Sequence, residues 1–229
     1  MNILFNNQYL EMLYEFMGKA DIRYFLNGFH IKPHSEQGVV LTATDGHRLV
    51  TIHDKDGFSD GEYIFPISKG LLSASKKKGR GIFSSKNIII IKGKALVNAI
   101  EYSEFPLDES ILDDGEFVSY IEFIKPIDGQ FPVASRIFKG LGEPKPTKNI
   151  GLNTHYLTGL NKLTSMQKYG AVSVYLYSSN DAILVVAGLS REVVALIMPA
   201  RLEEDSLSVP KFVLECGRDA GQLPQGVAA

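Results

Sequence analysis

The sequence predicts an α+β fold in which helices lie on one face of antiparallel sheets. The main observation is a repeated order: a short strand, a helix and several β-rich runs follow one another three times along the 229 residues. Short β-rich runs separated by turn residues are typical of antiparallel strands. Each unit is small for an independent core, so we expect the units to pair or to share sheets.

The first unit begins with a predicted strand over residues 2–6. Leu10, Leu13 and Met17 then recur at helical spacing, and Gly18 ends the helix. The β-rich runs that follow cover residues 24–31, 39–44 and 48–53. The unit therefore has one helix followed by a set of strands.

The second unit starts with a strand at residues 63–66 and a helix from about Ser68 to Lys77. Four isoleucines lie together between Asn87 and Lys92, as expected of a buried strand. We expect the strands of this unit at residues 82–85, 87–92, 96–102 and 117–123.

The third unit starts with a strand at residues 149–152, followed by a helix that Asn153 or Thr154 caps. Four apolar residues continue this helix at helical spacing: Tyr156, Leu157, Leu160 and Leu163. Strands are predicted at residues 172–177, 182–186 and 192–198.

The units define the expected domain organisation. Residues 1–139 form one domain of two units, and residues 149–202 form a third unit, equivalent to half a domain. The intervening linker, residues 140–148, is rich in Gly and Pro and is expected to be extended. Residues 203–229 lack periodicity and are expected to form a mobile tail.

Composition excludes several classes of protein. Hydrophobic residues make up 45% and charged residues 22%, which excludes an intrinsically disordered chain. A net charge of −2 excludes a globally basic nucleic-acid binder. It does not exclude a basic face, since residues 61–80 hold five basic residues and one acidic residue, a local charge of +4, while the segment 103–116 is acidic.

Cysteine content and hydropathy predict a cytoplasmic protein. Cys216 is the single cysteine, so an internal disulfide and a cysteine-based zinc site are excluded. The sequence contains no run of 18 apolar residues, and its N-terminus does not have the pattern of a signal peptide.

The sequence contains no arrangement of residues that is typical of a catalytic site. The five histidines have no metal-ligand spacing, and no complete phosphate-binding or dinucleotide-binding motif is present. We therefore expect no metal, no cofactor and no enzymatic activity. An unrelated α+β enzyme remains the least favoured alternative.

One segment needs more than a turn to explain it: Ala43-Thr-Asp-Gly-His-Arg-Leu49. Asp45-Gly46 is a strong hairpin signal by itself. The His47-Arg48-Leu49 sequence after it is not required by a hairpin.

This segment resembles the signature of the bacterial β sliding clamp, the processivity ring of DNA polymerase III. Other stretches resemble motifs of the same family in the same order. They are Arg23-Tyr-Phe-Leu-Asn-Gly28, Phe65-Pro-Ile-Ser-Lys-Gly70, Asp128-Gly-Gln-Phe-Pro132 with Arg136-Ile137, Ile150-Gly-Leu-Asn153 with Tyr156-Leu157, and Leu196-Ile-Met-Pro-Ala-Arg-Leu202. The resemblance covers the family's middle domain and the second half of its last domain, in a divergent and shortened form with an acidic insertion at residues 103–116.

The resemblance implies a DNA sliding clamp without chemistry of its own. Its main site would be a hydrophobic cleft that binds short peptides of polymerases and other clamp-binding proteins. The cleft positions carried over are Leu26, Thr44, Gly46, His47, Arg48, Leu49, Pro132, Arg136, Ile137, Leu196, Met198, Pro199 and Arg201. Aliphatic members would line a pocket for apolar anchors, while Arg136, Arg201 and His47 would hydrogen-bond the peptide. For each aliphatic residue taken singly, core packing is the alternative.

The resemblance also implies sequence-independent contact with DNA. The residues expected there are Arg23, Tyr24, Phe25, Lys69, Lys76, Lys77, Lys78, Arg80 and Lys162. A solvated helix end is the alternative for the three consecutive lysines. Since the family forms a closed ring of such units, a chain of three units implies a homo-oligomer. The alternative function is a clamp-derived interaction module that keeps the peptide cleft but does not encircle DNA.

Overall fold

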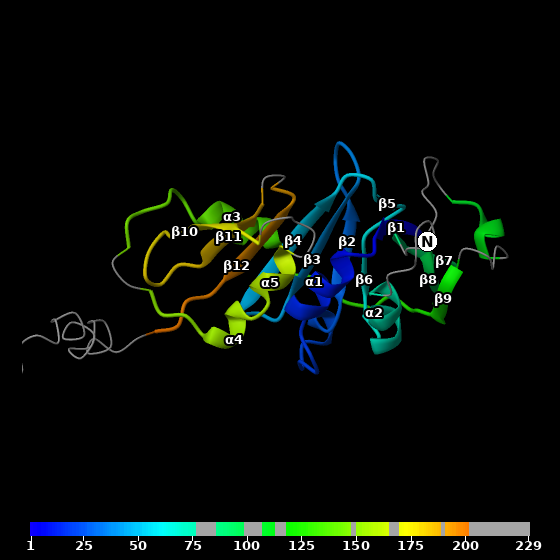
Figure 1. Ribbon diagram of the computed structural model, residues 1–229, viewed down its shortest axis with the longest axis horizontal. Helices are drawn as coiled ribbons and strands as arrows, with labels where there is room; N and C mark the ends of the chain where they lie inside the picture. The colour runs from blue at the N-terminus through cyan, green and yellow to red at the C-terminus, as the bar shows by residue number, and fades with distance from the viewer. Residues whose placement is uncertain are drawn as a thin grey trace, which may run out of the picture.

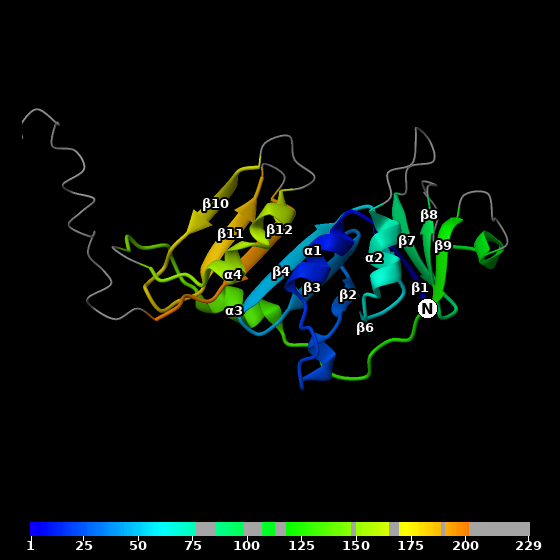
Figure 2. The ribbon, with the colours of Figure 1, turned by 60° about the horizontal axis from the view of Figure 1, so that its bottom comes forward.

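The computed structural model describes residues 1–76, 86–98, 107–112, 118–147, 150–164, 170–188 and 191–201. Within these ranges the chain forms two antiparallel sheets that stand side by side along the long axis of the molecule (Figures 1 and 2). Most of the described helices cover one face of the sheets, and the helix at Ala134–Gly140 lies on the other face. The predicted α+β class with antiparallel sheets is confirmed. None of the described helices is both long and apolar enough to cross a membrane.

The smaller sheet has five strands in the order β5-β1-β7-β8-β9. Its strands are β1 (Asn2–Asn6), β5 (Phe58–Ser59), β7 (Asn87–Ile91), β8 (Lys94–Asn98) and β9 (Val118–Phe123). The isoleucine run forms β7, which lies between β1 and β8. Strands of the first and second predicted units thus share one sheet.

The larger sheet has seven strands in the order β10-β11-β12-β4-β3-β2-β6. Its strands are β2 (Phe29–Pro33), β3 (Val39–Thr44), β4 (Arg48–Asp54), β6 (Tyr63–Phe65), β10 (Val172–Tyr175), β11 (Ile183–Ala187) and β12 (Val193–Ile197). β12 pairs directly with β4, where Ala195 lies opposite Val50 and Leu196 opposite Leu49. The third unit therefore continues the sheet of the first.

Helices form a layer over one face of both sheets. α1 (Tyr9–Phe16) packs on β3 and β4, and α2 (Lys69–Ser75) packs on β8 and β9. α5 (Leu160–Leu163) packs beside α1. The main core lies between these helices and the sheets, with Phe5, Phe16 and Phe29 fully buried in it.

Strand alternation separates this core from the opposite face of the large sheet. Val50 and Ile52 of β4 point into the main core, whereas Leu49 points away from it. On β12, Ala195 and Ile197 face the main core and Leu196 faces the other side. We call this other side the outer face.

A long connector after β9 crosses the outer face. The amide of Ile127 donates to the carbonyl of Ile64 on β6 over 2.7 Å, and Phe131 packs with Leu26 and Ile64. The connector then forms α3 (Ala134–Gly140), which rests on β4 and β12. It continues to Lys145, whose amide donates to the carbonyl of Leu176 after β10.

Two predicted strands differ from the structure. Residues 24–26 form a 3-10 turn rather than the start of a strand, and β2 begins only at Phe29. Gly28 lies so close to β6 that a Cβ there would meet the carbonyl oxygen of Phe65 at 2.4 Å. The predicted strand at 149–152 is reduced to a bridge between Gly151 and Ala200.

The helix predicted from residue 154 is interrupted. It consists of α4 (Thr154–Leu157) and α5, with Gly159 between them, and Asn153 caps α4 through its side chain. α3 was not predicted at all. The predicted strand at 82–85, most of the acidic segment 103–116 and the tail 203–229 lie outside the described residues.

A charge placed at the β4–β12 boundary should unfold both units together. Ala195 is fully buried between Val50 and Val185, so Ala195→Asp places a carboxylate where no partner is available. We expect it to lower the free energy of unfolding by about 3 kcal/mol or more. Ser173→Asp, at an exposed position of β10, should have little effect. Urea denaturation that removes β10–β12 alone and leaves β1–β9 folded would contradict a shared core.

Candidate functional site at the boundary between β4 and β12

The hairpin turn between β3 and β4 is held by its own side chains. Asp45 accepts hydrogen bonds from the amides of His47 and Arg48 at 2.9 and 3.0 Å. Thr44 Oγ1 donates to the carbonyl of Arg48 and accepts from the amide of Gly46. Gly46 has φ +90°, a conformation that favours glycine. Thr44, Asp45 and Gly46 are therefore explained by the turn.

Arg48 is buried and ties the turn to two other elements. Its Nε binds the Asp45 carboxylate at 3.0 Å, and its Nη2 donates to the carbonyl of Glu15 at 2.7 Å, near the C-terminal end of α1. The guanidinium lies over the ring of Phe16, 5.0 Å from its centre. Nη1 has no hydrogen-bond partner among the described residues, and a Cβ at Gly159 would lie 3.0 Å from it. Arg48 is therefore a structural residue rather than a free peptide ligand.

His47 lies at the surface where the third unit meets the turn. Its ring stacks on Tyr156 of α4 at 5.5 Å, with 11° between the planes. Its carbonyl accepts a 2.9 Å hydrogen bond from the amide of Met198, one residue past β12. The turn and the end of β12 are thus fixed side by side, as a shared binding site requires.

An apolar patch occupies the outer face beside this turn. Its base is made of Leu49, Leu196 and Ala182, all buried. Ala134, Phe138 and Leu141 of α3 and the adjoining chain rest on this base at helical spacing, together with Leu184 of β11. We call this arrangement the junction. Four residues of the junction were not predicted as site residues: Phe138, Leu141, Ala182 and Leu184. The helical spacing of Ala134, Phe138 and Leu141 was nevertheless visible in the sequence.

Several predicted members of the site remain accessible around the junction. Ile137 is 45% exposed and Met198 is 44% exposed. His47, Pro132, Arg136 and Arg201 are exposed, and Pro199 is half-buried. Neither Arg136 nor Arg201 makes an ion pair with any residue in the described ranges. Two cations and two apolar side chains are therefore available to a ligand.

Leu26 is separate from the junction. It is buried in another cluster with Ile64 and Phe131, beneath the connector. Its side chain packs the core there. Leu26 is therefore a packing residue outside the junction.

The predicted DNA contacts divide into two groups. Lys69 and Lys76 belong to α2 and its end, and Lys162 belongs to α5, so all three lie in the helix layer. Lys76 and Lys162 both bind the Glu11 carboxylate, each at 2.8 Å. Burial tends to raise the pKa of Glu11, but the two lysines outweigh this effect and lower it, so Glu11 stays ionised. Lys77, Lys78 and Arg80 lie outside the described residues.

Arg23, Tyr24 and Phe25 lie away from the helix layer, in the loop before β2. Arg23 is bound to Asp21 at 2.7 Å and packs against Gly46. The Tyr24 ring is 57% exposed, and Phe25 lies beside the connector at Gly129. Tyr24 alone of the three presents a free aromatic surface.

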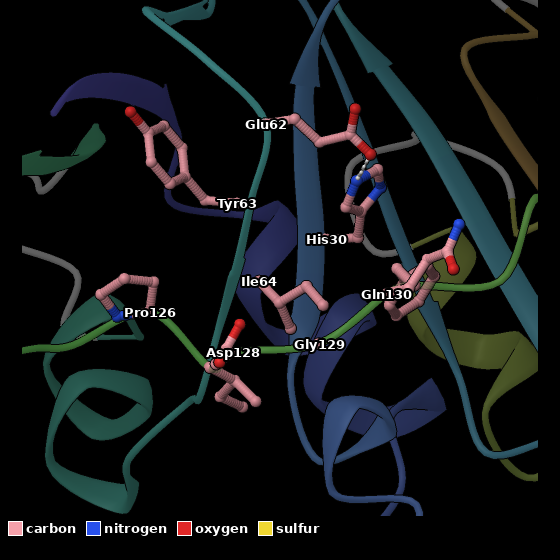
Figure 3. A pocket seen from close by; sticks show the side chains of 10 residues that line it. His30, Glu62, Tyr63, Ile64, Pro126, Asp128, Gly129 and Gln130 are labelled. Atoms are coloured by element: carbon pink, nitrogen blue, oxygen red, sulfur yellow. Dashed lines mark hydrogen bonds and ion pairs between the residues drawn. The ribbon is translucent and has the colours of Figure 1, made fainter.

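A second concave site was not predicted. It lies between β6, the end of β2 and the connector, with His30 and Glu62 facing each other across a 2.8 Å hydrogen bond (Figure 3). Burial lowers the pKa of His30 despite the opposing influence of Glu62. Across the described residues, no group of three histidine, cysteine or acidic side chains is arranged to hold a metal ion. No motif in the sequence pointed to this pocket, because the connector that completes it is distant from His30 along the chain.

Comparison with solved structures decides the fold family. The DNA polymerase sliding clamp of Pseudomonas aeruginosa matches with a TM-score of 0.57 and 17% identity, over 88% of this chain and 66% of the clamp. A DnaN sliding clamp from Bartonella birtlesii, bound to griselimycin, matches with a TM-score of 0.57 and 16% identity, over 88% of this chain and 66% of that one. The chain has the sliding-clamp fold.

A third sliding clamp, the β subunit of DNA polymerase from Streptococcus pyogenes, matches with a TM-score of 0.53 and 14% identity, over 87% of this chain and 65% of that subunit. This chain therefore spans about two thirds of the length of these sliding clamps. No protein-family model matches the sequence, and no curated protein matches it. The predicted resemblance is thus confirmed as a similarity of fold at low sequence identity.

Removing the Arg48 guanidinium should weaken the whole molecule. Arg48→Met leaves the carbonyl of Glu15 and Oδ2 of Asp45 without the guanidinium donor, while Oδ1 of Asp45 keeps its two amide donors. Because both acidic partners are partly exposed, we expect a loss of about 2 to 3 kcal/mol in the free energy of unfolding. Lys55→Met is the control, since Lys55 also joins the first and third units through Glu192 but is exposed. It should cost less than about 1 kcal/mol in urea denaturation, and equal losses in the two variants would contradict a special role for Arg48.

Proposed function

We propose that this chain is a shortened sliding clamp that binds short linear peptides of DNA-processing proteins and holds them on duplex DNA. The observation that carries the proposal is the direct pairing of β4 with β12, which places His47 and Met198 beside an apolar junction covered by α3. The peptide site draws on both the first and the third unit. No catalytic step is part of this function.

The junction has the chemistry that a peptide site needs. Ile137 and Met198 offer exposed apolar contact above the buried base of Leu49 and Leu196. Methionine adapts its shape to different apolar anchors. Arg136 and Arg201 are free to donate to carbonyl or carboxylate oxygens of a peptide. A short peptide with apolar anchors and an acidic or extended polar segment matches this surface.

The helix layer is the surface proposed to face DNA. Lys69, Lys76 and Lys162 lie on it, and Glu11 offsets one of their three charges. Lysine contacts with phosphate are independent of base sequence, as sliding requires. The layer is formed by helices that cover both sheets, so it offers one continuous surface to a duplex.

The proposed homo-oligomer uses the two ends of the molecule. Among the described strands, β9 is one edge of the small sheet and β10 is one edge of the large sheet, at opposite ends of the long axis (Figure 2). Phe123 on β9 is 87% exposed, and Ile121 of β9 and Val174 of β10 are also exposed. Pairing of β9 with β10 of another copy would be head-to-tail, and it closes a ring when the rotation between copies allows it.

The second candidate function is a module that binds peptides without encircling DNA. The salt bridges of Glu11 favour it, because two of the predicted DNA-binding lysines already have a partner. Both functions use the junction. They differ in whether the helix layer contacts DNA and in whether the two ends of the molecule join copies of the chain.

Ligand binding at the junction can be measured with griselimycin, which the clamp from Bartonella birtlesii binds. We expect calorimetric binding to this chain and a loss of about tenfold in affinity for Met198→Ala, because its exposed side chain supplies apolar contact. Arg136→Ala should weaken a carboxylate-bearing peptide by a similar factor. Glu36→Gln, at an exposed residue between β2 and β3, is the control. Unchanged affinity in both junction variants would contradict the site.

The clamp and the module differ in mass and in DNA retention. For the clamp, light scattering should give the mass of two or more copies of the 25.3 kDa chain. The oligomer should remain on a circular plasmid until the plasmid is cut. Lys69→Glu should shorten this retention and increase its sensitivity to salt. A constant monomer that is never retained, but still binds griselimycin, would contradict the clamp and support the module.

A further inference from the structure

The pocket beside His30 is independent of the junction and has a lining of its own. It has a volume of about 460 Å³ and opens on the outer face between β6 and the connector (Figure 3). It is lined by His30, Glu62, Tyr63, Ile64, Pro126, Ile127, Asp128, Gly129, Gln130 and Phe131. Half of these residues are apolar or aromatic and the others offer polar groups, as is typical of sites for small groups.

His30 forms the inner wall of this pocket. Its ring is buried and stacks on Phe131 at 5.0 Å, with only 8° between the planes. Its Nε2 donates to Glu62 Oε1, which fixes the position of that carboxylate over the pocket. Since burial lowers the pKa of His30, the ring is neutral near pH 7 and adds no positive charge to the site.

The remaining acidic and amide side chains of the pocket are exposed and open to a ligand. Glu62 uses only Oε1, and no residue in the described ranges donates to its Oε2. Asp128 and Gln130 likewise have no side-chain hydrogen bond within the described part of the chain. None of the lining residues is Lys or Arg. Lys32, whose charge acts on His30, is on β2 but does not line the pocket.

We propose that this pocket binds the arginine side chain of a partner protein's peptide. A guanidinium is planar, carries several donors in a fixed fork and is weakly hydrated, so it suits carboxylate acceptors that lie beside apolar surface. Glu62 and Asp128 supply the opposite charge, and Gln130 supplies a neutral acceptor. Pro126 and Ile64 provide apolar surface on which the aliphatic stem packs, whereas the Tyr63 ring lies on the other side of β6 against Phe65.

Other ligand classes fit this lining less well. An anion would meet two carboxylates and no cation in the lining. A metal ion would need a group of ligands that the described residues do not form. A lysine ammonium satisfies the charge but cannot present a planar fork of donors to a carboxylate, so we expect it to bind more weakly than arginine.

The proposal goes beyond the peptide site at the junction. The connector lines the pocket with residues 126–131 and then forms α3 over the junction, so both sites lie on the outer face. The arginine pocket would add specificity for partners with a basic residue. A negative result for the arginine pocket would leave the proposal for the junction unchanged.

The test is an NMR titration of the full chain with the peptide acetyl-Gly-Ser-Arg-Ser-Gly-amide. We expect saturable shifts of the Gly129 and Gln130 amides and of the His30 ring. The same peptide with citrulline, which is neutral and nearly isosteric, should give no saturable shift. A lysine peptide should bind about fivefold more weakly.

Two variants locate the site. Glu62→Gln keeps an oxygen that can accept from His30 but removes the charge, and it should weaken the arginine peptide about tenfold. Glu36→Gln removes an equal charge from an exposed loop residue outside the pocket and should leave affinity unchanged. The proposal is overturned by equal shifts with arginine and citrulline, by equal losses in the two variants, or by shifts confined to Met198 and the junction.

Discussion

The buried guanidinium of Arg48 is the interaction on which the arrangement of the units depends. It binds the turn through Asp45, the end of α1 through the carbonyl of Glu15, and it lies against Gly159 of the third unit. A charged group at this depth is costly unless most of its donors are used and its neighbours pack closely. Here Nε and Nη2 have partners, and Nη1 packs against Gly159. The position of the third unit is therefore set by contact with a charge as well as by the pairing of β12 with β4.

The order and type of most strands could be predicted because short β-rich segments and turn residues alternate along the sequence. β3 and β7 begin where the predicted strands begin, and the predicted helix start at about Ser68 matches α2, whose N-cap is Ser68. The errors have tertiary causes. The turn at 24–26 is followed by Gly28, which lies against the backbone of β6, and the helix of the third unit is interrupted at Gly159, which packs on Arg48. Neither contact involves residues that are close in the sequence.

Several residues predicted for the site lie together around the junction, whereas others lie elsewhere. The motif from Thr44 to Leu49 was identified, and the structure brings its turn to the end of β12. Arg48, however, faces inward, and Leu26 belongs to a different cluster. Helical spacing places Phe138 on one side of α3, but only the fold shows that this side rests on Leu49 and Leu196. The His30 pocket needed the path of the connector, which no local pattern encodes.

The two faces of the large sheet separate the proposed functions. Residues that alternate along β4 and β12 point either to the helix layer or to the junction, so one strand contributes to both without sharing a side chain. A peptide on the outer face thus leaves Lys69 and the other helix-layer cations accessible. Because Glu11 neutralises part of that layer, the proposed attraction for phosphate would be weaker than three unpaired lysines would give. The proposed peptide site and the proposed DNA surface do not compete for space, since the sheet keeps them on opposite sides.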